Sequence, residues 1–157
     1  YRRRLQGEVL LDAISLLTGQ PEKLSGLPMD GRAMQQWNHL LPSTFLDAFG
    51  RPDSSAAPPC EREIGGSVAQ ALHLMNSDNL QKKLSGKSLW LDELTATPQE
   101  KAVQNIYLRL FSREPDDNEK KVTLTHLRGE ADATKRRVLL EDLVWSLLNS
   151  AEFVLNH

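Results

Sequence analysis

The sequence is poor in residues that would point to a particular chemistry. Its one cysteine, Cys60, cannot close a disulfide within the chain, and we interpret it as a buried, inert thiol. The four histidines are scattered, and none has cysteine or carboxylate neighbours at the spacing that zinc sites use. We therefore expect neither a metal site nor a cysteine nucleophile, since nothing in the spacing brings His39 or His73 to Cys60.

Charge of one sign and aromatic side chains are also scarce. Nineteen basic and twenty-one acidic residues give a net charge of −2, which offers no general attraction to nucleic acid or to an anionic membrane. Aromatic residues make up 6% of the chain, too few for a platform on which single-stranded bases stack. We expect no nucleic-acid partner.

Long apolar runs and the common cofactor motifs are missing as well. No run approaches the roughly 18 to 20 residues that cross a bilayer, so we expect no membrane span in this chain. The sequence holds no CxxCH haem-attachment motif, no phosphate-binding glycine loop and no GxSxG elbow. It begins with Tyr1 and three arginines, which favours a fragment of a larger protein. We expect no cofactor in this fragment.

What the sequence does contain is a series of helix signals. Apolar residues at helical spacing predict a helix over residues 5–18, ended by Gly19. Capping pairs at Thr97 with Glu100 and at Asp116 with Glu119 predict helices over about 97–112 and 116–129. A last helix is expected over about 132–148. Its first turns carry residues 135–137, which are basic and lie at the wrong end of the helix dipole, so we expect them to be solvated.

The remaining segments are shorter or irregular. Residues 20–42 are rich in glycine and proline and predict an extended N-terminal arm. Short helices are expected over 44–49 and 78–84, a polar loop over 50–66, a helix beginning near Ser67, and a loop or turn over 89–94 pinned by Trp90. A chain of this length buries roughly 70% of its unfolded surface. We predict a single all-α domain, an irregular helical bundle of about six or seven helices with residues 67–157 as its main body.

A short sequence pattern occurs twice in the chain. Leu74 to Leu80 and Leu147 to Phe153 share the order leucine, apolar, asparagine, serine, two further residues, apolar. Asparagine ends helices and serine caps the next one, so each copy predicts a helix, a bend and a short helix. The alternative is that common helix-ending residues recur by chance.

One cluster of charged residues stands out as a candidate site. Arginines and carboxylates of both signs fall close together in the polar loop, and another arginine comes from the N-terminal arm: Arg32, Arg51, Asp53, Glu61, Arg62 and Glu63. They can satisfy one another as an ion network that pins the loop to the bundle. Alternatively they form a binding groove for a sugar or a peptide. We expect no catalytic residue among them.

Several sequence stretches, in the same order, carry a family resemblance. These are LDAFGRPDSS, CERE, AQALHLMNSDN, NIYLRLFSREPDDNE and EDLVWSLLNSAEFVLNH. Together they closely resemble the planctomycete domain of unknown function called PSD-one, over about residues 5–157. The resemblance implies a bacterial protein, the C-terminal part of a large chain that often also carries a cytochrome c-like domain. It therefore implies an extracytoplasmic location, periplasmic or at the cell surface, and haem c elsewhere in the full-length protein.

These observations favour a non-catalytic binding or scaffolding module of a larger exported bacterial protein. Its expected partners are other domains of the same polypeptide and a glycan or protein ligand. One alternative is a hydrolase of extracellular polymers, with Glu61 or Glu63 and Asp53 as acid and base. Another is a docking platform for the haem c domain, which would need a contiguous exposed apolar patch. Enzyme activity is the less favoured hypothesis.

Overall fold

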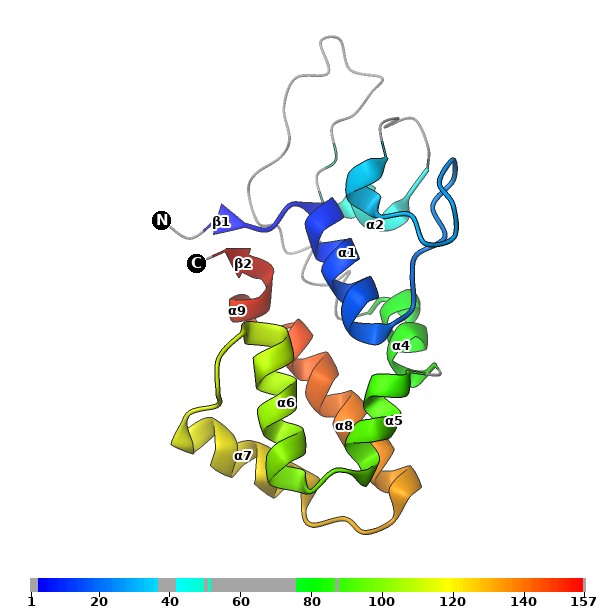
Figure 1. Ribbon diagram of the computed structural model, residues 1–157. Helices are drawn as coiled ribbons and strands as arrows, with labels where there is room; N and C mark the ends of the chain where they lie inside the picture. Colours follow the sequence, from blue (N-terminus) through cyan, green and yellow to red (C-terminus); the bar gives the residue numbers. More distant parts are fainter. Residues whose placement is uncertain (1–2, 37–41, 50, 52–75, 87, 157) are drawn as a thin grey trace.

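The computed structural model describes residues 3–36, 42–49, 51, 76–86 and 88–156 (Figure 1). These residues form eight α-helices, one 3₁₀ turn and one pair of two-residue strands. The predicted all-α class is confirmed.

The N-terminal part is built on helix α1 (Gly7–Thr18), which ends where Gly19 takes the left-handed conformation at φ 67°. An irregular segment then leads to the 3₁₀ turn η1 (Ala33–Gln35) and helix α2 (Thr44–Ala48). The Ser43 hydroxyl accepts a hydrogen bond from the backbone N–H of Leu46 and so caps α2. Both η1 and α2 pack on α1.

The C-terminal part is a bundle arranged around one long helix. Its helices are α4 (Asp78–Ser85), α5 (Leu89–Ala96), α6 (Gln99–Phe111), α7 (Asp117–Leu127), α8 (Ala133–Leu148) and α9 (Ala151–Val154). Helix α8 contacts each of α4, α5, α6, α7 and α9, and Figure 1 shows it running between α5 and α6. A single cluster of buried apolar side chains joins this bundle to α1 and α2. Fully buried members include Leu10, Leu91, Ile106, Leu140 and Val144.

The two ends of the described chain lie side by side (Figure 1). Strand β1 (Arg3–Arg4) pairs antiparallel with strand β2 (Leu155–Asn156), with Arg4 opposite Leu155. The backbone N–H of Leu5 continues the pairing by donating to the Val154 carbonyl at 2.9 Å. A short helix, α9, thus returns the C-terminal end to the start of α1.

Two local predictions were wrong. The loop expected at residues 89–94 is helix α5, which Ser88 caps and whose Leu91 and Leu94 are buried against α8. The capping box expected at Thr97 is not formed, because the Thr97 hydroxyl donates backwards to the Glu93 carbonyl at 2.9 Å. Helix α6 begins instead after Pro98 at its N-cap. The box at Asp116 and Glu119 is confirmed, with both hydrogen bonds present.

The helices of the described ranges are too short or too polar to cross a lipid bilayer. The longest of them, α8, has 16 residues and carries several charges.

Candidate binding site

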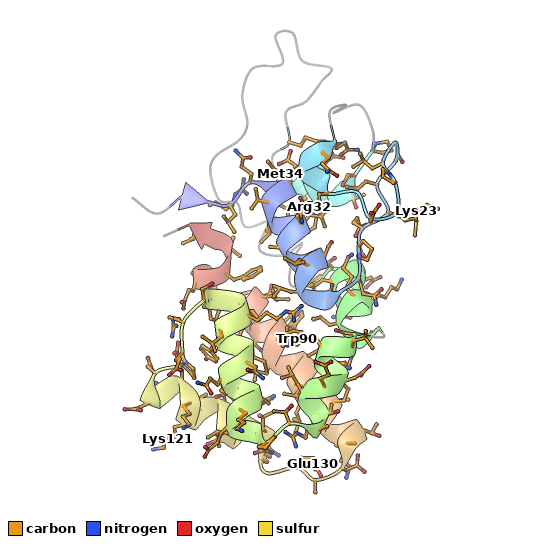
Figure 2. The ribbon with its side chains drawn as sticks, in the orientation of Figure 1. Lys23, Arg32, Met34, Trp90, Lys121 and Glu130 are labelled. Atoms are coloured by element: carbon orange, nitrogen blue, oxygen red, sulfur yellow. The ribbon has the colours of Figure 1, made fainter. Side chains whose placement is uncertain are left out.

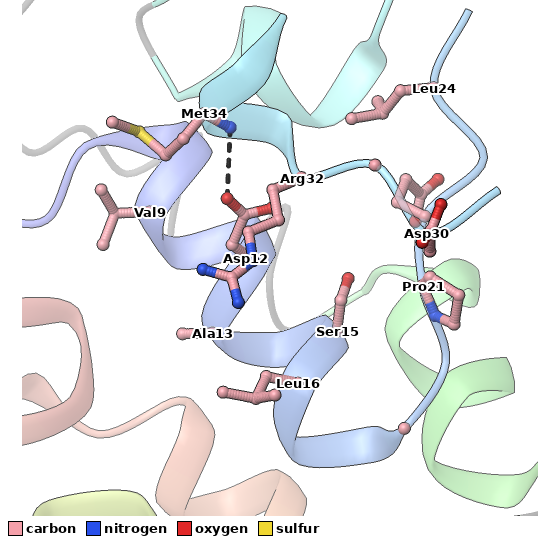
Figure 3. A pocket seen from close by; sticks show the side chains of 13 residues that line it. Val9, Asp12, Ala13, Ser15, Leu16, Pro21, Leu24, Asp30, Arg32 and Met34 are labelled. Atoms are coloured by element: carbon pink, nitrogen blue, oxygen red, sulfur yellow. Dashed lines mark hydrogen bonds between the residues drawn. The ribbon is translucent and has the colours of Figure 1, made fainter. Parts of the chain in front are cut away.

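A groove of about 600 Å³ lies between α1 and the irregular segment that follows it (Figure 3). One wall is a face of α1, and the other is formed by residues 19–34. Its apolar lining includes three side chains of α1 and one of η1, which together we call the α1 stripe: Val9, Ala13, Leu16 and Met34.

The α1 stripe follows from the spacing of the helix. Val9, Ala13 and Leu16 are four and then three residues apart, so they share one face of α1. The adjoining face of the helix carries Leu10 and Leu17, which are buried in the core. Leu16 is 72% exposed and Met34 is 55% exposed, whereas Val9 and Ala13 are half-buried, so Leu16 and Met34 supply most of the exposed apolar surface of the stripe. Helix α1 thus has more apolar surface than its own core uses.

Asp12 fixes the wall opposite the stripe. Its two carboxylate oxygens accept the backbone N–H groups of Ala33, at 2.6 Å, and of Met34, at 3.1 Å. Figure 3 draws the second of these bonds. Asp12 therefore caps the start of η1 from a different helix and holds the irregular segment against α1. Since both oxygens are engaged, this carboxylate serves the structure of the groove.

A second carboxylate anchors the same segment to helix α4. Glu22 pairs with the buried Lys83 at 3.1 Å and accepts two hydrogen bonds from the Asn79 amide, at 3.0 and 2.9 Å. Lys83 also donates to the Gln20 carbonyl at 2.6 Å. The irregular segment is thus held at both of its ends by contacts within the chain.

Two arginines lie at the α1 stripe, and neither has a carboxylate partner among the described residues. Arg32 lines the groove, where its guanidinium lies over α1 (Figure 3). Arg109 comes from α6 and donates to the Leu16 carbonyl at 3.3 Å, at the C-terminal end of α1. Its guanidinium also lies 4.6 Å from the centre of the Trp90 ring.

The structure describes two of the six predicted site residues, Arg32 and Arg51, and places them apart. Arg32 lines the groove, whereas Arg51 does not. The Arg51 side chain is 5% exposed and pairs with Asp47, four residues earlier, through bonds of 2.6 and 3.0 Å. Arg51 is therefore a structural clasp at the end of α2. Asp53, Glu61, Arg62 and Glu63 lie outside the described residues, as does Cys60, so the predicted ion network of the loop stays a prediction.

The prediction that the basic residues 135–137 at the start of α8 are solvated is wrong for two of the three. Lys135 is exposed, but Arg136 donates to the Leu94 and Thr97 carbonyls at the end of α5. Arg137 donates to the Leu84 and Gly86 carbonyls at the end of α4, at 3.1 and 3.0 Å. These cations lie at the wrong end of their own helix, yet they cap the C-terminal ends of two neighbours, where positive charge is favourable.

Arg137 is also the centre of an ion cluster. It pairs with Asp92 of α5 and, at 2.6 Å, with Glu141 one turn along α8. Its side chain is 15% exposed. One guanidinium thus joins α4, α5 and α8.

Arg113 makes a similar cluster at the other side of the bundle. It forms paired hydrogen bonds with Glu119 of α7 and with Glu152 of α9, all between 2.7 and 2.8 Å. The Arg113 guanidinium holds the pKa of Glu119 below its ordinary value, and the two carboxylates raise the pKa of Arg113. Burial, with the Glu119 charge as second cause, raises the pKa of the nearby Tyr107 to about 12.

A metal centre finds no support in the part of the chain that the structure describes. There, no three His, Cys, Asp or Glu side chains are grouped so that they could hold a metal ion. His126 instead places its Nε2 atom 3.0 Å from the Leu139 carbonyl and joins α7 to α8.

Comparison with known proteins gives a family. Residues 1–127 match the family model PSD1, described as a protein of unknown function (DUF1553). The match covers most of the chain, which therefore belongs to this family. No curated protein and no solved structure was found to match it.

Sequence reasoning missed the groove, although one signal for it was present. Leu16 widens the apolar face of α1 beyond what one buried face needs, and such a surplus indicates a second contact surface. Arg109 carried no comparable signal, because its contacts with Leu16 and Trp90 form only in the folded chain.

Proposed function

We propose that this chain is a non-catalytic binding or scaffolding module of a larger, exported bacterial protein. The groove on α1 is its ligand surface, in place of the polar loop favoured by the sequence. One observation carries the proposal: the groove combines an exposed apolar stripe with an arginine, while the carboxylates of Asp12 and Glu22 are engaged in holding its walls.

The state of these carboxylates supports binding over hydrolysis. A general acid and base need two carboxyl groups that reach the substrate and exchange protons with it. In the groove, Asp12 accepts two backbone N–H groups and Glu22 is paired with Lys83, so Asp30 is the one exposed carboxylate of the described lining and has no second such carboxylate there to act with. Such arrangements fix a wall and leave the recognition of a ligand to the stripe and to Arg32.

The wider setting of the module is part of the same proposal and is supported by the family resemblance. It includes an extracytoplasmic location, other domains of the same polypeptide as partners and a haem c domain elsewhere in the full-length protein. Fractionation of cells that carry the tagged full-length protein tests the location. Recovery in the periplasm or at the cell surface is expected, and recovery in the cytoplasm alone would contradict it.

Binding and catalysis can be separated with the purified chain. It is applied to glycan and peptide arrays and, in parallel, incubated with model polysaccharides and proteins while released ends are measured. We expect saturable binding that Leu16→Glu weakens and no release of ends. The matched control is Val122→Glu, since Val122 is 59% exposed on α7 and lies outside the groove. Turnover of a polymer without saturable binding would overturn the proposal.

A further inference from the structure

The α1 stripe has the geometry of a surface that receives a helix. Val9 and Leu16 are about 10 Å apart along the axis at 1.5 Å per residue, which spans about two turns. Apolar side chains spaced by four and three residues present a ridge that packs against the side chains of a second helix. The residues of α1 also make their backbone hydrogen bonds within the helix, so its side offers no free edge to which a strand could add.

The two arginines beside the stripe, and not the net charge of the groove lining, favour carboxylates on a partner. The Asp12 carboxylate is taken up by two backbone N–H groups, and Glu22 is neutralised by Lys83. Asp30 is exposed and also lines the groove, where Figure 3 shows it beside Pro21 and apart from the Arg32 guanidinium. By contrast, Arg32 and Arg109 make no ion pair within the described ranges, and both adjoin the stripe.

Both arginines are placed to receive carboxylates. Arg32 lines the groove together with Ala13 and Leu16, and Arg109 contacts the last turn of α1. A guanidinium group recognises a carboxylate through two parallel hydrogen bonds, which adds direction to the attraction. Contact with Trp90 holds the Arg109 guanidinium in place before any partner arrives.

We propose that the α1 stripe docks an acidic amphipathic helix of a protein partner, whose apolar face covers the stripe and whose flanking carboxylates pair with Arg32 and Arg109. This inference rests on the proposed binding function and names the class of ligand. A glycan would instead require several polar groups converging on one spot, whereas the stripe is apolar.

Two pools of labelled helical peptides test the proposal. Both pools share a leucine ridge at i, i+4 and i+7; the flanking positions are glutamate in one pool and lysine in the other. Binding to the whole chain is followed by fluorescence anisotropy at low and high salt. We expect the acidic pool to bind about tenfold more tightly than the basic pool, with the difference shrinking at high salt.

Charge reversal then locates the contact. Arg32→Glu should weaken binding of the acidic pool by about tenfold and strengthen that of the basic pool, since it makes the groove acidic. The matched control is Lys121→Glu, an equal charge change on α7, at the far end of the molecule from the groove in Figure 2. Thermal unfolding of each variant shows that the fold is kept.

The outcomes distinguish this inference from the function on which it rests. The proposal of an acidic partner helix would be overturned by equal binding of both pools or by no binding of the acidic pool. Equal effects of the two charge reversals would also overturn it. If a glycan binds in the arrays while neither pool does, the binding function stands and this inference falls. Concentration-dependent self-association that Leu16→Glu abolishes would replace the partner helix by a second copy of the chain.

Discussion

Two arginines that join helices of the C-terminal bundle and two arginines that lie beside the α1 stripe have different partners. Arg113 and Arg137 each meet two carboxylates and link helices that are distant in sequence. Arg32 and Arg109 lie against an exposed apolar stripe and meet no carboxylate in the described parts of the chain. Arg113 and Arg137 thus hold the fold, whereas Arg32 and Arg109 remain free to meet the carboxylates of a ligand.

This contrast separates stability from recognition. A cation whose hydrogen bonds are satisfied within the protein gains little from a partner and costs stability when it is removed. A cation without a carboxylate loses little when it is removed, but it can contribute to binding. We therefore expect substitution of Arg113 or Arg137 to lower the free energy of unfolding, and substitution of Arg32 or Arg109 to weaken ligand binding.

The largest effect on stability is expected for Arg137→Ala. It removes ion pairs to Asp92 and Glu141 and leaves the Leu84 and Gly86 carbonyls without their donor. Because the side chain is 15% exposed, we expect a loss of about 2 to 3 kcal/mol in the free energy of unfolding. Urea denaturation followed by circular dichroism measures it. Lys121→Ala is the control, and an equal loss in both variants would contradict the role given to Arg137.

A smaller effect is expected for Arg113→Ala, and it should depend on pH. Arg113 is 38% exposed, so we expect a loss of only about 1 kcal/mol at neutral pH. The folded-state pKa of Glu119 lies below its ordinary value of 4.5, so its stabilising contribution is present above that pH and is lost as the pH falls below it. The difference in the free energy of unfolding between Arg113→Ala and the original chain should therefore shrink as the pH falls below 4.5.

Denaturation curves at a series of pH values measure how the stability loss of Arg113→Ala depends on pH. Arg137→Ala, whose Glu141 partner lies elsewhere in the bundle, serves as the comparison for the size of the loss at neutral pH. A difference for Arg113→Ala that grows as the pH falls would mean that the pairing with Glu119 is not its source.

The smallest effect on stability is expected for Arg32→Ala. Its guanidinium makes no ion pair with another described residue, so the free energy of unfolding should change by no more than about 0.5 kcal/mol. Binding of the acidic peptide pool should nevertheless weaken about tenfold. Denaturation and anisotropy on the same preparation give both values. A large loss of stability with unchanged binding would place Arg32 with the bundle arginines.

The parts of the fold that the sequence predicted are those fixed by neighbours in the chain. Asp116 and Glu119 begin α7 as expected, and Ser77 and Ser150 cap α4 and α9 through the N–H groups three residues later. The shared serine therefore has the same role at α4 and α9, whereas the helix expected before Asn76 lies outside the described residues and stays a prediction. Helix α5 was missed because two turns of apolar and polar residues do not distinguish a helix from a turn.

The contacts that define the candidate site depend on the folded chain. Arg137 meets residues 45 to 53 positions away, so its capping of α4 has no local signal. The pairing of Arg51 with Asp47 did have one, since the two are four residues apart on α2. Of the predicted site residues, Arg32 lies in the groove, and its value as a site residue comes from Leu16 and Met34 beside it.

The most direct test of the contrast is a crystal structure of the chain with one peptide from the acidic pool. We expect the peptide helix to lie along the α1 stripe, with carboxylates within hydrogen-bonding distance of Arg32 and Arg109, while Arg113 and Arg137 keep their present partners. A peptide bound elsewhere, or bound on the stripe with both groove arginines unengaged, would contradict the account.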